Sequence, residues 1–373
     1  MASPRAYVTP SVLLWARESV ALDLARAATK IDVSVEQLER AEHGDHLLTL
    51  RQAERAAEAY GRAFAELFMP RPPNEPTVET RFRMLRGVSR GPWSHELVKL
   101  ERDIRRRQKA MTEIYAALGE DPPWLHVASS LRLGHEVPSE DVVRHLLHLE
   151  PPILRAPSYN SYWHSRKIVL RAIEWTGVLV IRQSVPDDGV RGFLLPHPEV
   201  PAIFVNSADD PRAQAYTIVH EFAHLLVAHL GLSEDDEEAR CDLFAGRVLM
   251  PRDDFIARFK EGSSSDAVAT ASAVAREFGV TPFAAAVRAR QLDLFTFADV
   301  DRVQHRQKLA PRESSGGDGN RNKVSRLSPT FTDMVLTAAD ASAVTLSAAS
   351  RLLRTKIDDF DKLRRFTAEA LAE

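Results

Sequence analysis

The sequence predicts an α+β protein that is mostly helical, with one small sheet near the middle of the chain. Apolar residues recur at helical spacing through most of the 373 residues. Three short runs, 178–181, 192–195 and 202–205, are instead rich in apolar and β-branched residues between Pro, Gly and Asp, which is typical of strands. The 27% of charged and 44% of hydrophobic residues indicate an ordinary globular chain, long enough for several domains.

Bulk properties exclude several classes of protein. No apolar run approaches the roughly 18–20 residues of a membrane span, so we expect no membrane partner. The N-terminus lacks the apolar stretch of a secretory signal, and the single Cys241 cannot form an internal disulfide, so we expect a cytoplasmic protein. A formal net charge of −3 argues against a strongly basic, nonspecific nucleic-acid binder. The sequence is compatible with an oligomer but does not predict one.

The first domain expected is a compact helical unit over residues 1–70. Ser34 and Thr49 are expected to cap two of its helices, the first in a capping box with Gln37. The proline-rich stretch that follows cannot continue a helix. We expect a linker and helical connector over 71–160, with ten Lys or Arg against three acids between residues 81 and 109.

The second domain expected, residues 161–310, holds the small sheet and the helices after it. The pattern predicts a long helix over about 212–230 and another over about 238–250, which stops at a proline. As a hypothesis, strand 202–205 is an edge of the sheet and pairs with an extended peptide. A glycine-rich linker then leads to a helical C-terminal region, 323–373.

The long helix carries the motif H-E-x-x-H as His220, Glu221 and His224. Residues four apart lie on one face of a helix, so the two imidazoles can bind one cation. Glu221 is not needed as a ligand and can take a proton from the attacking water. The alternative is a helix that happens to carry these residues on a solvated face. The place of the motif, straight after a small sheet, favours the metal site.

A catalytic zinc takes three protein ligands and keeps one position open, so a third ligand is expected just after the long helix. The acidic loop 233–237 is expected to be solvated, and His229 faces away from the motif. Cys241 is more typical of a buried small hydrophobe than of a ligand. Asp242 lies one turn after Glu238 on the same helix face and can orient an imidazole by accepting its free N–H. The candidates weighed are Glu234, Glu237, Glu238, Cys241, Asp242 and His229.

These residues resemble those of the ImmA/IrrE-type metallopeptidases. The resemblance implies a minimal zincin-like domain, a small sheet with the H-E-x-x-H helix, in which His220, His224 and Glu238 bind Zn²⁺ and Glu221 is the general base. Asp242 departs from the family pattern, in which Asn is common, and the pair 246–247 departs where Ala-Glu is frequent. The matching residues are Arg212, the segment 220–224, Glu238, Cys241-Asp242, Phe244-Ala245 and Leu249-Met250-Pro251.

The resemblance extends to both sides of the motif. Residues 9–68 look like the Cro/repressor-type (XRE) helix-turn-helix domain that precedes the peptidase in longer members, and 267–294 resemble the helical piece that follows it. The expected recognition helix offers Gln37 and Arg40 to DNA bases. However, residues 1–70 hold eight Lys or Arg against ten Asp or Glu, which is poor for binding phosphates. DNA binding and protein docking therefore both stay open.

Taken together, these observations predict a zinc metallopeptidase, which is a hydrolase. Its expected substrate, implied by the resemblance, is an intracellular repressor or antitoxin, often encoded nearby, and DNA binding is a further expectation. Arg212 and Tyr216 precede His220 by one or two turns and are candidates for stabilising the transition state, although either can be structural. The rivals are a helix-turn-helix transcription regulator with a structural or sensory metal site and a toxin–antitoxin component that acts by sequestration.

Overall fold

A computed structural model of the chain describes residues 4–75, 77, 93–132, 138–149, 161–185, 190–231, 236–308 and 326–372. These residues are mostly helical and contain a three-stranded sheet, which confirms the predicted α+β class. The chain divides into two compact units. One comprises Met1–Leu85 with Ser89–Arg105, and the other comprises Arg86–Val88 with Arg106–Glu373. Among the described helices, none combines the length and the hydropathy needed to span a membrane.

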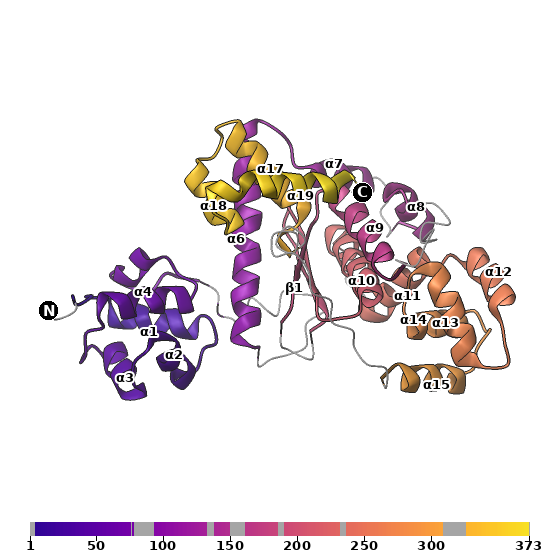
Figure 1. Cartoon of the computed structure of the whole chain (residues 1–373), viewed down its shortest axis with the longest axis horizontal. Coiled ribbons are helices and arrows are strands. Elements are labelled where there is room, and N and C mark those ends of the chain that lie inside the picture. The colour runs from indigo at the N-terminus through magenta and orange to yellow at the C-terminus, as the bar shows by residue number, and fades with distance from the viewer. Residues whose placement is uncertain are drawn as a thin grey trace. The chain divides into compact units, whose positions relative to one another are not determined.

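The described residues of the first unit form the short helices α1 to α4, which Figure 1 labels, and the 3-10 turn η1. The expected capping box of Ser34 is present, because its hydroxyl accepts from the Gln37 N–H and the Gln37 side chain accepts from the Ser34 N–H. Thr49 and Gln52 form the same box one helix later. The helix-turn-helix arrangement itself stays a prediction. The elements are α1 (Pro10–Glu18), α2 (Leu24–Ile31), α3 (Val35–His43), α4 (Leu50–Ala59) and η1 (Phe64–Phe68).

A buried ion pair joins α1 to α3 in this unit. Arg17 donates to both carboxylate oxygens of Glu42, at 2.7 and 2.9 Å. Glu42 is only 7% exposed, so one of the acids of α3 is neutralised inside the unit rather than presented to solvent.

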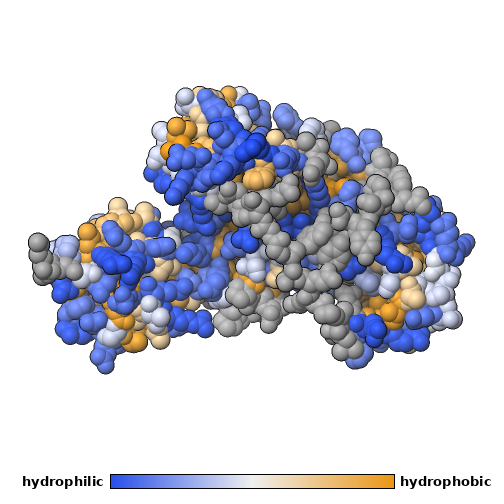
Figure 2. Space-filling view, in the orientation of Figure 1, coloured by the Kyte–Doolittle hydropathy of each residue, from blue (hydrophilic) through white to orange (hydrophobic). Residues whose placement is uncertain are grey.

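On the face in view, the surface of the first unit is mostly hydrophilic, with small hydrophobic areas between (Figure 2).

The second unit contains the sheet and most of the helices. Its helix α6 (His95–Leu118) also contributes its first residues to the first unit. The further elements are α7 (Pro123–Arg132), α8 (Glu140–Leu146), α9 (Ser161–Trp175), β1 (Leu179–Gln183), β2 (Gly192–Leu195), β3 (Ala202–Asn206), α10 (Pro211–His229), α11 (Glu237–Leu249), α12 (Arg252–Gly262), α13 (Ala267–Phe278), α14 (Pro282–Gln291), α15 (Phe297–Lys308), α17 (Pro329–Asp340), α18 (Leu346–Leu353), η2 (Ile357–Asp359) and α19 (Phe360–Ala372). The domain limits predicted at residues 70, 160, 310 and 323 stay predictions.

The sheet has the strand order β1-β3-β2, with β3 parallel to β1 and antiparallel to β2. The hypothesis that 202–205 is an edge strand is therefore wrong, because β3 is central and pairs on both sides. All five residues of β3 are buried and four of them are apolar. The edge strands β1 and β2 are buried almost as completely, so an unbroken apolar run indicates a sheet covered on both faces but does not identify the central strand. Among the described strands, β1 and β2 form the edges.

Helices α10 and α11 position the residues of interest. Helix α10 begins with Pro211, and the Asp210 side chain caps it by accepting from the Arg212 N–H at 2.9 Å. Helix α11 begins after Asp236, whose φ of 68° turns the chain into the helix. The first two residues of α11 are both glutamates, which the positive end of the helix dipole stabilises. The two helices pack against each other, and α10 also packs against β2 and β3.

Candidate metal centre

Three side chains from α10 and α11 converge at one point. The Nε2 atoms of His220 and His224 lie 3.1 Å apart. The two carboxylate oxygens of Glu238 lie 3.4 Å from Nε2 of His220 and 3.3 Å from Nε2 of His224. His224 is buried, while the Glu238 side chain is 67% exposed. The structure thus brings together the three residues that the resemblance implied as ligands.

The size of this triangle fits a small divalent cation. Ligand bonds of roughly 2.0–2.1 Å in a tetrahedron place the donor atoms about 3.3–3.4 Å from one another. The two Nε2 atoms, 3.1 Å apart, are close to that spacing, and each nitrogen has one oxygen of the Glu238 carboxylate at 3.3 or 3.4 Å. Two imidazole nitrogens and a carboxylate are also a donor set that zinc commonly takes. The residues present therefore fit a metal ion.

Two carboxylates contact the opposite nitrogens of the imidazole rings. Oδ1 of Asp242 lies 3.0 Å from Nδ1 of His220. Oε1 of Glu237 lies 2.6 Å from Nδ1 of His224. The contact of Glu237 is a hydrogen bond, and that of Asp242 is a close charge contact. A carboxylate at Nδ1 favours the tautomer that has its proton there and leaves Nε2 free to bind a metal. Asp242 thus contacts the imidazole of His220, and Glu237, expected to be solvated, has a side chain that is only 19% exposed.

Glu221 is buried next to the triangle, at 2% exposure. It accepts a hydrogen bond from the backbone N–H of Leu194 in β2. Its Oε2 atom is buried and has no hydrogen-bond partner among the described residues. Burial raises the pKa of Glu221 to about 8, although His220 and the Leu194 N–H act in the opposite direction. The site therefore holds a carboxyl group with proton affinity well above that of an ordinary glutamate.

The charges around His220 also favour a bound cation. Burial by itself lowers the pKa of His220, but the carboxylates of Asp242, Glu221 and Glu238 together outweigh it, so the pKa is raised. Three acidic groups thus surround this imidazole, with Asp242 at Nδ1 and Glu238 at Nε2. A divalent cation in the triangle would neutralise the same negative potential.

Tyr216 and Arg212 hold structural contacts. The Tyr216 hydroxyl donates to the carbonyl oxygen of Asp242 at 2.6 Å and so ties α10 to α11. Arg212 pairs with Asp210 at 2.8 Å, beside the start of α10. His229, in the last turn of α10, contacts the Ala128 carbonyl at 2.9 Å.

The residues predicted for DNA contact lie in the other unit, on α3. Gln37 uses its amide oxygen in the capping box. Arg40 donates to the carbonyl oxygen of Asp45 at 3.1 Å. Both side chains are exposed. Glu234, weighed as a third ligand, lies outside the described residues.

The sequence analysis set Glu237 aside as solvated and assigned strand β2 no role at the site. A signal for Glu237 existed, because it lies one turn before Cys241 and five residues before Asp242 on a helix that already carried candidates. The contribution of β2, the Leu194 N–H, is a backbone group. No side-chain motif could have indicated it.

Comparison with known protein families agrees with this geometry. Residues 173–290 match the IrrE N-terminal-like domain. The matched segment runs from the last turn of α9 into α14 and so contains the sheet, the H-E-x-x-H helix and α11. It supports the resemblance to the ImmA/IrrE type and indicates a metallopeptidase-related function with a metal cofactor. No curated protein and no solved structure matches the chain.

Proposed function

We propose that the chain is a zinc-dependent endopeptidase that cleaves an intracellular regulatory protein, a repressor or an antitoxin. The observation that carries this proposal is the triangle of donors beside a buried carboxyl group. His220, His224 and Glu238 would hold the zinc ion. The ion, when bound, supplies Lewis-acid polarisation of the scissile carbonyl group and of the attacking water.

Glu221 is the residue that moves the proton in this proposal. Its Oε2 atom lacks a hydrogen-bond partner among the described residues, so it can accept the proton of an attacking water. It can then hand that proton to the leaving amine. The Leu194 N–H holds the carboxyl group in place during both transfers. Asp242 and Glu237 orient the two imidazoles.

The outer edge of β2 is the place proposed for the substrate backbone. The Asn206 N–H donates to the Arg191 carbonyl at 2.7 Å, so in this antiparallel pair every second residue of β2 directs its backbone groups toward β3. Gly192 and Leu194 are the residues between, and their backbone groups point to the other side. The Leu194 N–H reaches Glu221 there. An extended peptide beside β2 would therefore pass next to the general base.

In the decisive experiment, the Glu221→Gln variant is purified, analysed for bound metal and incubated with any repressor or antitoxin encoded next to its gene. We expect metal content equal to that of the parent protein and cleavage reduced by at least about 100-fold, because a general base contributes that much. Glu36→Gln, an exposed residue of α3, serves as the control and should cleave normally. Cleavage by Glu221→Gln at the parent rate would refute the assigned role.

The substrate path along β2 has its own test. N-methylation of one backbone amide near the scissile bond should raise KM when that amide pairs with β2, because the methyl group removes the donor. A series of substrates methylated at successive amides should show this effect at alternate positions. Equal KM values along the series would remove β2 as the substrate edge.

DNA binding through Gln37 and Arg40 stays part of the proposal as a second activity. Arg40→Ala should weaken binding to an operator fragment, measured at fixed salt concentration. An unchanged affinity, or no binding by the parent protein, would leave the first unit as a docking module for proteins.

A further inference from the structure

A second group of metal-binding side chains lies on the opposite side of His224 from the triangle. Its donors are Nδ1 of His224, the carboxylate of Glu237 and the thiol of Cys241, and the three lie within 4.8 Å of one another. Nδ1 lies 2.6 Å from Oε1 of Glu237 and 3.5 Å from Sγ of Cys241. The triangle uses none of these three atoms.

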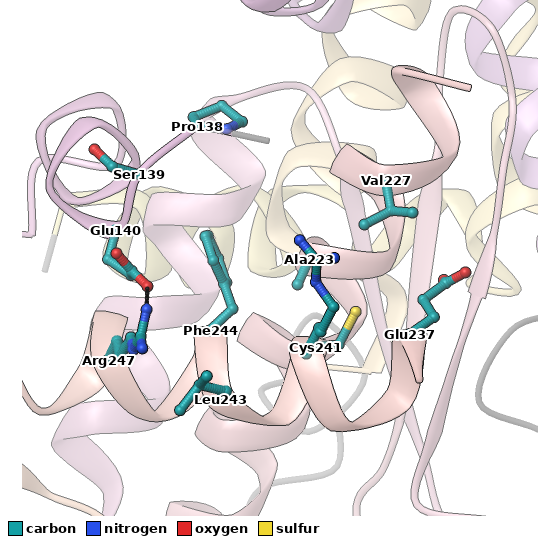
Figure 3. Close-up of a pocket in the computed structure, with 11 residues that line it drawn as sticks. Pro138, Ser139, Glu140, Ala223, Val227, Glu237, Cys241, Leu243, Phe244 and Arg247 are labelled. Atoms are coloured by element: carbon teal, nitrogen blue, oxygen red, sulfur yellow. Dashed lines mark hydrogen bonds and ion pairs between the residues drawn. The ribbon is translucent and has the colours of Figure 1, made fainter. Parts of the chain in front are cut away.

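A pocket of about 300 Å³ opens next to these donors, between α8, α10 and α11. Figure 3 shows Glu237 and Cys241 on α11, one turn apart, and Ala223 and Val227 on α10. Although Cys241 is only 1% exposed as a residue, it lines this pocket together with Glu237. An ion that enters this pocket therefore meets two of the three residues, Glu237 and Cys241, while His224 does not line it.

The spacing of the donors fits a thiophilic ion. A metal–sulfur bond of about 2.3 Å and a metal–nitrogen bond of about 2.0–2.1 Å in a tetrahedron place the two donor atoms about 3.6 Å apart. The observed separation of Nδ1 and Sγ is 3.5 Å. Oε1 of Glu237 is closer than this geometry requires, so its carboxylate must withdraw slightly from Nδ1. It can do so because Glu237 is the first residue of α11 and is partly exposed.

We propose that His224, Glu237 and Cys241 form a second, inhibitory site for a soft or borderline divalent cation such as Cd²⁺ or Zn²⁺. Thiolate, imidazole and carboxylate donors select such ions over Mg²⁺ and Ca²⁺, which prefer oxygen ligands. Binding releases the thiol proton and the Nδ1 proton to solvent, because both atoms must be free to coordinate.

The second site affects the first through the shared imidazole. When Nδ1 binds an ion, Glu237 no longer accepts its proton, and the ring loses the contact that orients it. A second ion also places a positive charge near the first. The second ion therefore binds more weakly than the first and lowers peptide cleavage, and this last consequence rests on the proposed function.

The test uses Cd²⁺ and the full chain already loaded with one equivalent of Zn²⁺. Thiolate coordination to Cd²⁺ gives a charge-transfer absorption in the ultraviolet, and Cys241 is the single cysteine of the chain, so any such signal reports this site. We expect the absorption to appear with a second equivalent of bound metal. Cys241→Ser should lose both the signal and the second equivalent.

Glu237→Gln keeps the thiol and should lower the affinity for the second ion by at least 10-fold. Glu238→Gln should instead lower the affinity for the first ion and keep the thiolate signal. The Cys241→Ser protein is compared with the parent by circular dichroism to show that it is folded. The proposal is overturned when the parent binds a single equivalent without thiolate absorption, or when Cys241→Ser retains both equivalents. A thiolate signal without any peptide cleavage would instead reject the proposed function and keep the second site.

Discussion

The structure leaves no room for a side chain at Gly192, at the start of β2. An added Cβ atom at Gly192 would lie 2.5 Å from Cγ2 of Thr217 and 2.8 Å from the carbonyl oxygen of Phe204. These separations are 0.9 and 0.6 Å shorter than the 3.4 Å at which ordinary contact begins. The carbonyl oxygen belongs to the central strand and cannot rotate away. Gly192→Ala must therefore displace β2 or α10.

The loss of stability expected of Gly192→Ala follows from the known cost of overfilling a packed core. Inserting a methyl group into a packed core costs about 1–3 kcal/mol, which exceeds the roughly 0.4–1 kcal/mol that alanine gains over glycine through the unfolded chain. We expect the urea midpoint of Gly192→Ala to fall accordingly. Displacement of β2 also moves the Leu194 N–H away from Glu221. The cleavage rate should therefore fall even at temperatures where the variant is fully folded.

Two variants make this prediction specific. Gly246→Ala places its Cβ 3.7 Å from the Tyr216 hydroxyl, in ordinary contact and inside a helix, and should stabilise the protein by about 0.5–1 kcal/mol. The double variant Gly192→Ala/Thr217→Ser removes Cγ2 but keeps the clash with the Phe204 carbonyl, so it should recover only part of the loss. A Gly192→Ala protein as stable as the parent would refute the reasoning.

Further predictions concern the metal, the pH dependence of stability and the first unit. Asp242→Asn should weaken zinc binding by about 10–100-fold in a chelator competition, because the amide oxygen holds the Nδ1 proton of His220 less strongly, and unchanged affinity would reject this contact. Burial raises the pKa of Glu174 to about 7, so the unfolded chain releases this proton at lower pH than the folded chain. Stability should fall on the order of 3 kcal/mol as the pH rises from about 4.5 to 7, and the slope of urea midpoints against pH should flatten in Glu174→Gln. Arg17→Ala leaves the Glu42 carboxylate buried without its partner and should destabilise the first unit by about 3–5 kcal/mol in thermal unfolding, whereas a loss below about 1 kcal/mol would show the pair to be dispensable.

Local signals in the sequence were sufficient for most helices and for the motif. Ser34 and Thr49 cap the helices expected of them, because a capping box depends on residues only three apart. His220 and His224 are likewise fixed relative to each other by a single helix turn. Such short-range geometry needs no knowledge of the fold.

Long-range pairing could not be predicted in the same way. The order of strands in the sheet depends on which strand enters between the others, and the chain order alone does not set it. The side chain of Glu237 was expected in solvent because the start of α11 was placed one residue too late. The positive φ of Asp236 determines where that helix begins, and an aspartate in this conformation is not distinguishable by spacing. The contact of Glu221 with the Leu194 backbone joins residues 27 positions apart and leaves no trace in side-chain pattern.

The first turn of α11 places two consecutive carboxylates on the two nitrogens of one ring, Glu237 at Nδ1 and Glu238 at Nε2 of His224. Fraying of that single turn releases both contacts at once. Metal binding at the triangle and folding of the first turn of α11 are therefore coupled. Amide exchange at the start of α11 should slow in proportion to the metal bound.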